Sequence, residues 1–202
     1  MIGAVLLAAG SGRRFGGDKL LAQLADGTPI AVATTAMLVA TLPHVVAVVR
    51  PDAAILTAAL RERGADVVLC PHADEGMGTS LAWGVAAASG WTGWIVALAD
   101  MPFVQPATVR MLAAAVAGGA ALAAPRYEGR RGHPVCFGVS YRKALLALRG
   151  DRGGRDLLRA AENLLHVVDC DDPGVLVDID TPLELERLAA RSGTPMSHRH
   201  TN

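Results

Sequence analysis

The first residues whose types and spacing suggest a binding site follow a short apolar run at the amino terminus. Residues 8–19 include four glycines, two arginines and a lysine. Glycines let the backbone approach a ligand closely, and exposed backbone N–H groups can form a nest for an anion. Fixed positive charge on Arg13, Arg14 and Lys19 adds to this, so the segment predicts a polyphosphate site. The alternative is a flexible glycine turn whose charges are merely solvated.

Two better-known glycine motifs nearly match this segment and fail. The dinucleotide fingerprint needs a third glycine where this chain has Phe15, and no acidic residue follows at the expected distance. The P-loop motif accepts Gly12 and Gly17, but Asp18 precedes Lys19 and no hydroxyl residue follows it. These mismatches argue against a dinucleotide-dependent oxidoreductase and against a P-loop enzyme.

Carboxylates stand at two later points in the chain. Asp100 directly follows the apolar run of residues 94–98, and Asp178 and Asp180 lie two residues apart in a segment where they would point to the same side if extended. Mg²⁺ prefers one or two carboxylates together with phosphates and water, so Asp100 with Asp180, or with Asp178 as second choice, predicts a metal site. Helix capping is the alternative role for each. Asp169, Asp171 and Asp172 are expected to be solvated turn residues.

Three further stretches combine glycine with polar side chains. Residues 75–81 offer the hydroxyls of Thr79 and Ser80, which could contact a ligand or cap a helix. Residues 130–134 place His133 after two arginines, a cluster that could hold an anionic acceptor. Residues 150–155 end in Arg155, which could reach a phosphate or bond to Asp151.

The elements that must position these residues alternate along the chain. Short aliphatic runs predict strands at residues 2–8, 45–49, 65–70, 94–98, 120–124, 134–139 and 164–168. Helices are predicted at residues 29–42, 52–63, 79–88, 106–117, 140–148, 155–163 and 181–190, with Thr28 capping the first and a capping box of Thr181 and Glu184 opening the last. This alternation predicts an α/β fold with a mostly parallel central sheet, and ligands bind such sheets at the carboxyl ends of the strands.

Composition limits the class of protein. Hydrophobic residues make up 51% of the 202 residues and aromatic residues 4%, so the core must consist mainly of aliphatic side chains. Lys plus Arg equals Asp plus Glu at 19 each, which leaves no net positive field for nucleic acid or a membrane. Three scattered cysteines and no targeting or membrane segment indicate a cytoplasmic protein. Residues 192–202 are expected to be a disordered tail.

Residues 7–19 resemble the L-A-A-G-x-x-x-R-x-G-x-x-K signature of the MobA-like nucleotidyltransferases, with Phe15 where members commonly have Met. Within that family the chain is most similar to the molybdenum cofactor cytidylyltransferases. Similar motifs follow in the family's order: G-M-G-x-S-L at residues 76–81, D-M-P at 100–102, R-G-H-P-V at 131–135, G-D-x-G-x-R at 150–155 and D-x-D-T-P at 178–182. The resemblance covers nearly the whole chain.

The resemblance implies a three-layer Rossmann-like nucleotidyltransferase fold and a role for each motif. It implies one domain at residues 1–191, with a nucleotide-binding part at about 1–125 and an acceptor-binding part at about 126–191. The implied catalytic residues are Arg14, Lys19 and Asp100, and the implied Mg²⁺ ligands are Asp100 and Asp180. The implied nucleotide-binding residues are Leu7, Ala8, Ala9, Gly10, Ser11, Gly12, Arg13, Arg14, Lys19, Gly78, Ser80 and Asp100. Arg131, His133 and Arg155 are the implied acceptor-binding residues.

The activity implied is Mg²⁺-dependent transfer of CMP from CTP to molybdopterin, with release of pyrophosphate. Ala9 is the feature associated with cytidylyl transfer, because a side chain there would crowd a purine more than a pyrimidine. Guanylyl transfer to the same cofactor and cytidylyl transfer to a sugar or polyol phosphate are the sister alternatives. A non-catalytic cofactor carrier is the alternative of another class. A recipient molybdoenzyme of the xanthine dehydrogenase type and a monomer or homodimer are further expectations.

Overall fold

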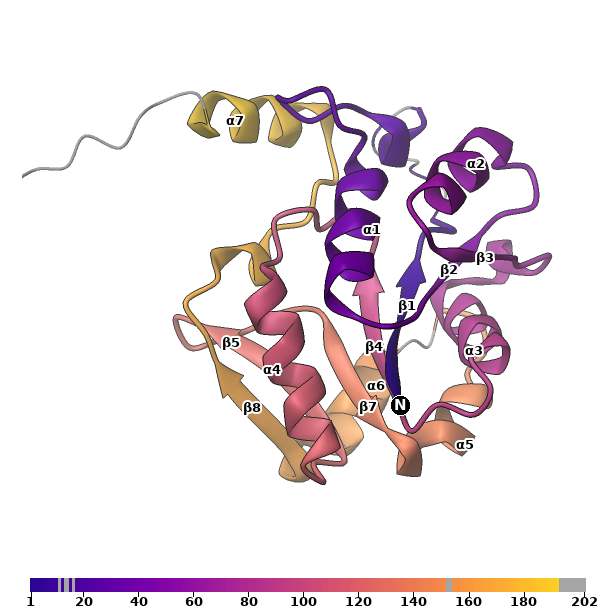
Figure 1. Cartoon of the computed structure of the whole chain (residues 1–202), viewed down its shortest axis with the longest axis vertical. Helices are drawn as coiled ribbons and strands as arrows, with labels where there is room; N and C mark the ends of the chain where they lie inside the picture. The colour runs from indigo at the N-terminus through magenta and orange to yellow at the C-terminus, as the bar shows by residue number, and fades with distance from the viewer. Residues whose placement is uncertain (11, 13–14, 16, 152–153, 193–202) are drawn as a thin grey trace, which may run out of the picture.

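An eight-stranded sheet forms the centre of the protein (Figure 1). The computed structural model describes residues 1–10, 12, 15, 17–151 and 154–192. The strands are β1 (Ile2–Leu7), β2 (Val45–Val49), β3 (Asp66–Leu69), β4 (Gly93–Leu98), β5 (Leu122–Tyr127), β6 (Arg130–Arg131), β7 (Val135–Gly138) and β8 (Leu165–Asp169).

The order of the strands creates a switch point beside β1. Strands β1, β2 and β3 run parallel in one direction across the sheet, and the chain then crosses over to place β4 parallel to β1 on its other side. Strand β7 is antiparallel to β4 and β5, while β8 is parallel to β5. The expected mostly parallel sheet is therefore confirmed, with its antiparallel part in the carboxyl-terminal half. Ligands of such sheets bind where the strand order reverses, which here is the carboxyl ends of β1 and β4.

Helices cover both faces of the sheet and give three layers (Figure 1). The helices are α1 (Ile30–Thr41), α2 (Ala54–Glu62), α3 (Met77–Ala87), α4 (Pro106–Ala117), α5 (Arg142–Leu146), α6 (Gly154–Ala160) and α7 (Pro182–Ser192). Successive strand side chains point to opposite faces, so Leu6 packs in one core with helices α1, α2 and α4, and Val5 packs in the other with α3, α5 and α6. In both cores the buried side chains are mainly Ala, Val and Leu, as the low aromatic content predicts.

Several predicted boundaries are wrong for local reasons. Helix α1 has Pro29 at its N-cap and no side-chain capping bond, so Thr28 does not cap it. Helix α3 begins at Met77, so Thr79 and Ser80 lie inside its first turns and do not cap it. Strand β6 lies in a stretch that the sequence assigned to a loop.

The carboxyl-terminal half departs further from the predicted helices. The helix expected at residues 140–148 is a short 3₁₀ turn, η3 (Val139–Tyr141), followed by five residues of α5. The helix expected at 155–163 is shorter, because α6 ends at Ala160, and the 3₁₀ turn η4 (Glu162–Leu164) follows it. The predicted capping box is confirmed: the Thr181 N–H donates to Glu184 at 2.9 Å, and the Glu184 N–H donates to the Thr181 hydroxyl at 3.3 Å.

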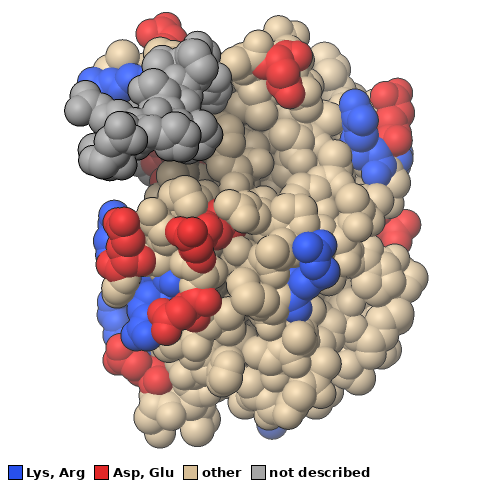
Figure 2. Space-filling view, turned by 60° about the vertical axis from the view of Figure 1, so that its left-hand side comes forward, with Lys and Arg blue, Asp and Glu red and all other residues tan. Residues whose placement is uncertain are grey.

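Charged side chains are few on the face that carries α4 and β8. Figure 2 shows Lys, Arg, Asp and Glu there in small neighbouring groups of both signs, separated by wide uncharged areas. A two-point ion pair joins the adjacent strands β5 and β8, with Arg126 donating to Asp169 at 2.6 and 2.8 Å. Within the described part of the chain, no helix combines the length and apolar character needed to cross a bilayer.

Candidate functional site

A lysine and two aspartates meet at the carboxyl ends of β1 and β4. The Lys19 ammonium donates to Asp100 Oδ2 at 2.7 Å and to Asp180 Oδ1 at 3.0 Å. These residues are far apart in sequence, yet their side chains are only 12%, 20% and 27% exposed. The structure thus brings together the lysine of the first glycine-rich loop and the two carboxylates that the sequence selected.

Backbone bonds place each member of this cluster. Ala99 follows β4 and donates to the Leu7 carbonyl at 3.1 Å, which fixes Asp100 beside the end of β1. The Ile179 N–H donates to the Asp100 carbonyl at 3.0 Å, and this bond brings Asp180 next to Asp100. Lys19 begins the 3₁₀ turn η1 (Lys19–Leu21), and its N–H donates to Gly17 at 2.8 Å. Asp178 is exposed, so Asp180 is the carboxylate that shares Lys19 with Asp100.

The electrostatics keep the lysine charged. Partial burial acts to lower the pKa of Lys19, but hydrogen bonds and charge from Asp100 and Asp180 outweigh it, and the pKa is raised above its ordinary value. The second carboxylate oxygen of Asp100, Oδ1, is buried and accepts no hydrogen bond from the described residues. A buried carboxylate oxygen without a donor is costly, and a cation is one partner that would satisfy it. Among the residues described, no group of three or more His, Cys, Asp or Glu is arranged to hold a metal ion, and Asp100 and Asp180 are the two carboxylates that meet here.

The first loop leaves the sheet as the sequence predicts, although part of it lies outside the described residues. Ala8 and Ala9 are buried at the end of β1, and Gly10 is exposed. Gly12 has a positive φ of 56°, and a β-carbon there would approach the Gly17 carbonyl to 3.0 Å. Glycine therefore suits the turn at this position. The predicted ligands Ser11, Arg13 and Arg14 lie outside the described residues.

Ala9 is buried on the face of the sheet that packs against α3, α5 and α6. It is 6% exposed and belongs to the buried cluster that includes Leu81 and Ala82 of α3. Helix α3 begins at Met77, within the glycine-rich stretch at residues 76–78.

The amino-terminal turn of α3 is joined to the loop before α6. The Gly78 N–H donates to the Gly150 carbonyl at 2.8 Å, and the Gly150 N–H donates to the Thr79 hydroxyl at 3.0 Å. Gly76 has a φ of +133°, and a β-carbon there would collide with Gly150 and Asp151. Ser80 is buried, and its hydroxyl donates to the Gly76 carbonyl at 3.4 Å. Two loops that the sequence treated separately thus form one unit, which we call the loop clasp (residues 76–80 and 150–151).

The acceptor-side residues are placed less completely. Arg131 is exposed at the end of β6. The His133 N–H donates to the Val175 carbonyl at 2.9 Å, and the peptide bond from His133 to Pro134 is cis. His133 and Met101 both line a small pocket. The backbone of Arg155 is part of α6, but its side chain lies outside the described residues.

Asp172 is the site-supporting residue that the sequence missed. It was expected to be a solvated turn residue, and this is wrong, because its exposure is 1%. One oxygen accepts from the Gln105 N–H at 2.9 Å and the Thr108 hydroxyl at 2.7 Å, and the other accepts from the Gly174 N–H at 2.9 Å. These bonds attach the segment that leads to Asp180 to the start of α4. The one sequence signal was the order Asp-Pro-Gly at residues 172–174, which is typical of a capped turn.

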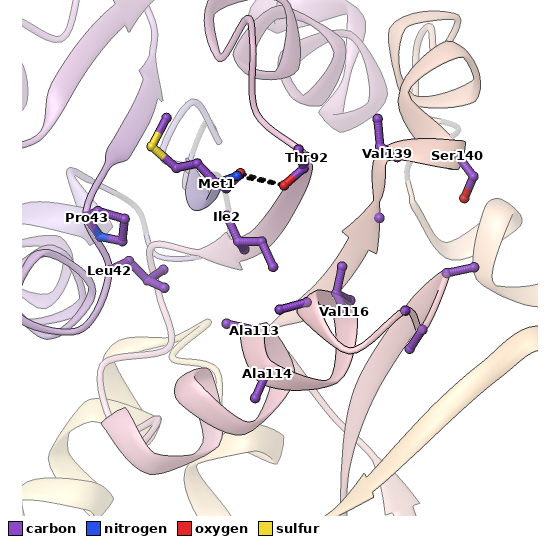
Figure 3. A pocket seen from close by; sticks show the side chains of 15 residues that line it. Met1, Ile2, Leu42, Pro43, Thr92, Ala113, Ala114, Val116, Val139 and Ser140 are labelled. Atoms are coloured by element: carbon purple, nitrogen blue, oxygen red, sulfur yellow. Dashed lines mark hydrogen bonds between the residues drawn. The ribbon is translucent and has the colours of Figure 1, made fainter.

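A large hollow lies at the other end of the sheet from this cluster. It has a volume of about 660 Å³ and opens beside the amino end of β1 and the carboxyl end of α4. Figure 3 shows Ile2, Leu42, Ala113 and Val116 around it, with the Met1 ammonium donating to the Thr92 hydroxyl at 2.7 Å. No residue selected from the sequence lines it.

Comparison with known proteins gives one consistent family. The sequence model of the MobA-like NTP transferase domain matches residues 4–167. The chain is 34% identical to "Nicotine blue oxidoreductase" of Paenarthrobacter nicotinovorans over 91% of this chain and 94% of that protein. It is 30% identical to "Purine catabolism protein PucB" of Bacillus subtilis, over 90% of this chain and 93% of that one.

Solved structures agree with the sequence comparison. Rv0371c from Mycobacterium tuberculosis H37Rv superposes with a TM-score of 0.81 at 28% identity, covering 94% of this chain and 97% of that chain. The same protein in a complex with manganese gives a TM-score of 0.78 at 27% identity, covering 94% and 98%. The fold expected from the resemblance is thus confirmed. With the sequence family, the shared fold and the charged cluster at the switch point in agreement, this chain belongs to the MobA-like NTP transferase family of nucleotidyltransferases.

Proposed function

We propose that the chain transfers CMP from CTP to the terminal phosphate of a molybdopterin-type acceptor and releases pyrophosphate, with Mg²⁺ as cofactor. The observation that carries the proposal is the cluster of Lys19, Asp100 and Asp180 at the carboxyl ends of β1 and β4. It combines a fixed ammonium, which suits triphosphate oxygens, with two carboxylates, which suit a divalent cation.

The buried Oδ1 of Asp100 fits a metal ligand, because it has no hydrogen-bond donor among the described residues. The manganese complex of Rv0371c supports a divalent cation in this family. When bound, the cation would neutralise charge on the triphosphate and on the leaving pyrophosphate. Asp100 and Asp180 would hold it, and we prefer Asp180 to the exposed Asp178 as the second ligand.

The chain's own residues would position the reactants and neutralise charge. An oxygen of the acceptor phosphate attacks the α-phosphorus in line, and the bond from that phosphorus to the β-phosphate oxygen breaks. The acceptor phosphate is already ionised, so no Ser or Cys nucleophile is required. Lys19, and in our proposal Arg14, stabilise the charge on the phosphates, and such contributions are typically about 10²–10³-fold each in rate.

Specificity for base and acceptor is assigned by the remaining motifs. We assign the base to Gly78 and Ser80 in the loop clasp and the triphosphate to residues 7–13. Arg131, His133 and Arg155 are proposed to hold the acceptor phosphate and pterin. Cytosine is the base that the Ala8-Ala9-Gly10 version of the first loop favours by family resemblance.

The division of labour in the chain is also part of the proposal. Residues 1–125 would bind the nucleotide and residues 126–191 the acceptor within one domain. The boundary falls inside β5, so one continuous sheet carries both parts. A molybdoenzyme of the xanthine dehydrogenase type would receive the product, which accords with the purine catabolism named for PucB, since xanthine is a purine.

Pyrophosphate release measured with CTP, GTP, ATP and UTP, with and without molybdopterin and Mg²⁺, tests the proposal. We expect release only with CTP, acceptor and metal together. Activity restricted to GTP would replace the cytidylyl assignment with the guanylyl one, and activity with a sugar or polyol phosphate would change the acceptor. Acceptor binding without pyrophosphate release from any nucleotide would indicate a carrier.

One relative is named for a different chemistry. The protein from Paenarthrobacter nicotinovorans is called an oxidoreductase and is 34% identical to this chain. The same preparation should therefore be tested for oxidation of NADH and NADPH with nicotine blue as acceptor. We expect none, because Phe15 replaces the third glycine of the dinucleotide fingerprint. Turnover there without pyrophosphate release would favour the oxidoreductase.

A further inference from the structure

Lys19 contacts the same two carboxylates that the proposed function assigns to the divalent cation. Its ammonium lies 2.7 Å from Asp100 Oδ2 and 3.0 Å from Asp180 Oδ1, and so bridges the pair. The ammonium occupies one oxygen of each carboxylate, so a cation that used both carboxylates would have to bind close beside the ammonium or displace it. The Lys19 ammonium and the divalent cation would therefore compete for the same pair of carboxylates.

We propose that Lys19 and the divalent cation compete for Asp100 and Asp180, so that the cation binds tightly only when a triphosphate draws the Lys19 side chain away. The inference rests on the proposed function for the identity of the metal site. It concerns the order in which metal and nucleotide bind, which the family assignment leaves open.

Charge and burial make the competition strong. The Lys19 side chain is 12% exposed, so solvent screens its charge less than it would on an open surface. A dication bound to the buried Oδ1 of Asp100 would lie close to the ammonium bonded to Oδ2 of the same carboxylate. Repulsion between the two cations opposes simultaneous binding, while either one alone is attracted to the carboxylates.

The lysine is the partner that can move. Asp180 is held from both sides, because the Ile179 N–H donates to the Asp100 carbonyl and the Asp180 N–H donates to Glu184 at 2.8 Å. The Lys19 backbone is held by the bond from its N–H to Gly17. Its ammonium, bonded to the two carboxylates, is carried on a flexible four-carbon side chain and has rotatable donors. Swinging the side chain to a phosphate leaves the backbone of η1 in place.

A triphosphate would complete the exchange. It supplies oxygens for the displaced ammonium and further ligands for the cation, which prefers phosphate and water beside one or two carboxylates. Metal and nucleotide should then strengthen each other's binding, because linkage makes the coupling reciprocal. Part of that coupling comes from direct contact between metal and phosphate. The rest comes from Lys19, which leaves the carboxylates when it binds the phosphate.

Binding of Mn²⁺, followed by electron paramagnetic resonance of the free ion, tests the inference without turnover. Without nucleotide, Lys19→Met should bind Mn²⁺ about tenfold more tightly than the wild type, because the competing charge is gone. Lys19→Gln, which keeps a neutral donor, should also bind more tightly, and circular dichroism checks the fold of both variants. With a non-hydrolysable CTP analogue, the gain in Mn²⁺ affinity should be larger in the wild type than in Lys19→Met.

Lys143 supplies the matched control, since it is the chain's one other lysine and is exposed on α5. Lys143→Met should bind Mn²⁺ as the wild type does, with and without nucleotide. Equal or weaker Mn²⁺ binding by both folded Lys19 variants would overturn the competition.

The proposed function can fail separately. Mn²⁺ binding that is unchanged in Asp100→Asn and Asp180→Asn would remove the metal site, and the competition with it. Tight Mn²⁺ binding in Lys19→Met without pyrophosphate release by the wild type would support the competition and refute the transferase.

Discussion

The two ends of the sheet differ in chemistry. The amino end has a hollow of about 660 Å³, and none of the described residues that line it is Asp, Glu, Lys or Arg. The carboxyl end brings Lys19, Asp100 and Asp180 within 3.0 Å contacts at the switch point of the strands. The hollow at the amino end is lined mainly by apolar side chains (Figure 3).

Charge and topology decide in favour of the carboxyl end. Parallel strands place the loops that follow them at one edge, so residues distant in sequence converge there, whereas the amino end receives the loops that follow helices. The amino-end hollow has a single charged group, the Met1 ammonium, and it is already bonded to Thr92. The following changes test whether function is confined to the carboxyl end.

The largest effect is expected at Asp100. Replacing it with Ala removes the buried oxygen assigned to the cation and one partner of Lys19, so we expect pyrophosphate release to fall by at least about 10³-fold. The thermal transition should persist, since the residue is not part of either hydrophobic core. Near-normal turnover of folded Asp100→Ala with CTP and Mg²⁺ would contradict the assignment of function to the carboxyl end of the sheet.

Asp172→Ala should act through stability. The variant leaves two backbone N–H groups and the Thr108 hydroxyl without their buried acceptor, which should cost about 2–4 kcal/mol of unfolding free energy. Denaturant unfolding measures it. The neighbouring Asp171 is exposed, and Asp171→Ala should change stability by less than about 0.5 kcal/mol. Equally small losses of unfolding free energy in Asp171→Ala and Asp172→Ala would show that the hydrogen bonds of Asp172 contribute little to stability.

Asp100 and Asp172 also show which features of the site could be predicted from the sequence and which could not. Asp100 was predictable because it directly follows a buried strand and matches a family motif. Asp172 lies close to Asp169 and Asp171 in sequence, and apart from the Asp-Pro-Gly order that it begins, its contact with the start of α4 is what distinguishes it from them. Strand order, and the choice of Asp180 over Asp178, likewise depend on contacts across the chain, such as the bond from Ile179 to Asp100.

Gly76→Ala should give an intermediate effect on activity. A β-carbon at a φ of +133° is strained, and it would also meet Gly150 and Asp151, so the loop clasp would have to separate. We expect the KM for CTP to rise by about tenfold, with a smaller change in kcat, because the clasp carries the proposed base contacts. Gly90 is the matched control, with a φ of +83° and open space around it. Gly90→Ala should lose a little stability and keep its KM.

The smallest effect is expected at the amino end. Ala114 is exposed on α4 and lines the hollow, so Ala114→Asp places a charge in it without burying that charge in the core. If catalysis belongs to the carboxyl end alone, kcat and KM should stay within about twofold of the wild type, as for other surface changes away from a site. Size-exclusion chromatography on the same variant separates a second possibility. A loss of activity accompanied by a change in molecular mass would mean that the amino end joins copies of the chain, and a loss without such a change would make the hollow itself part of the site.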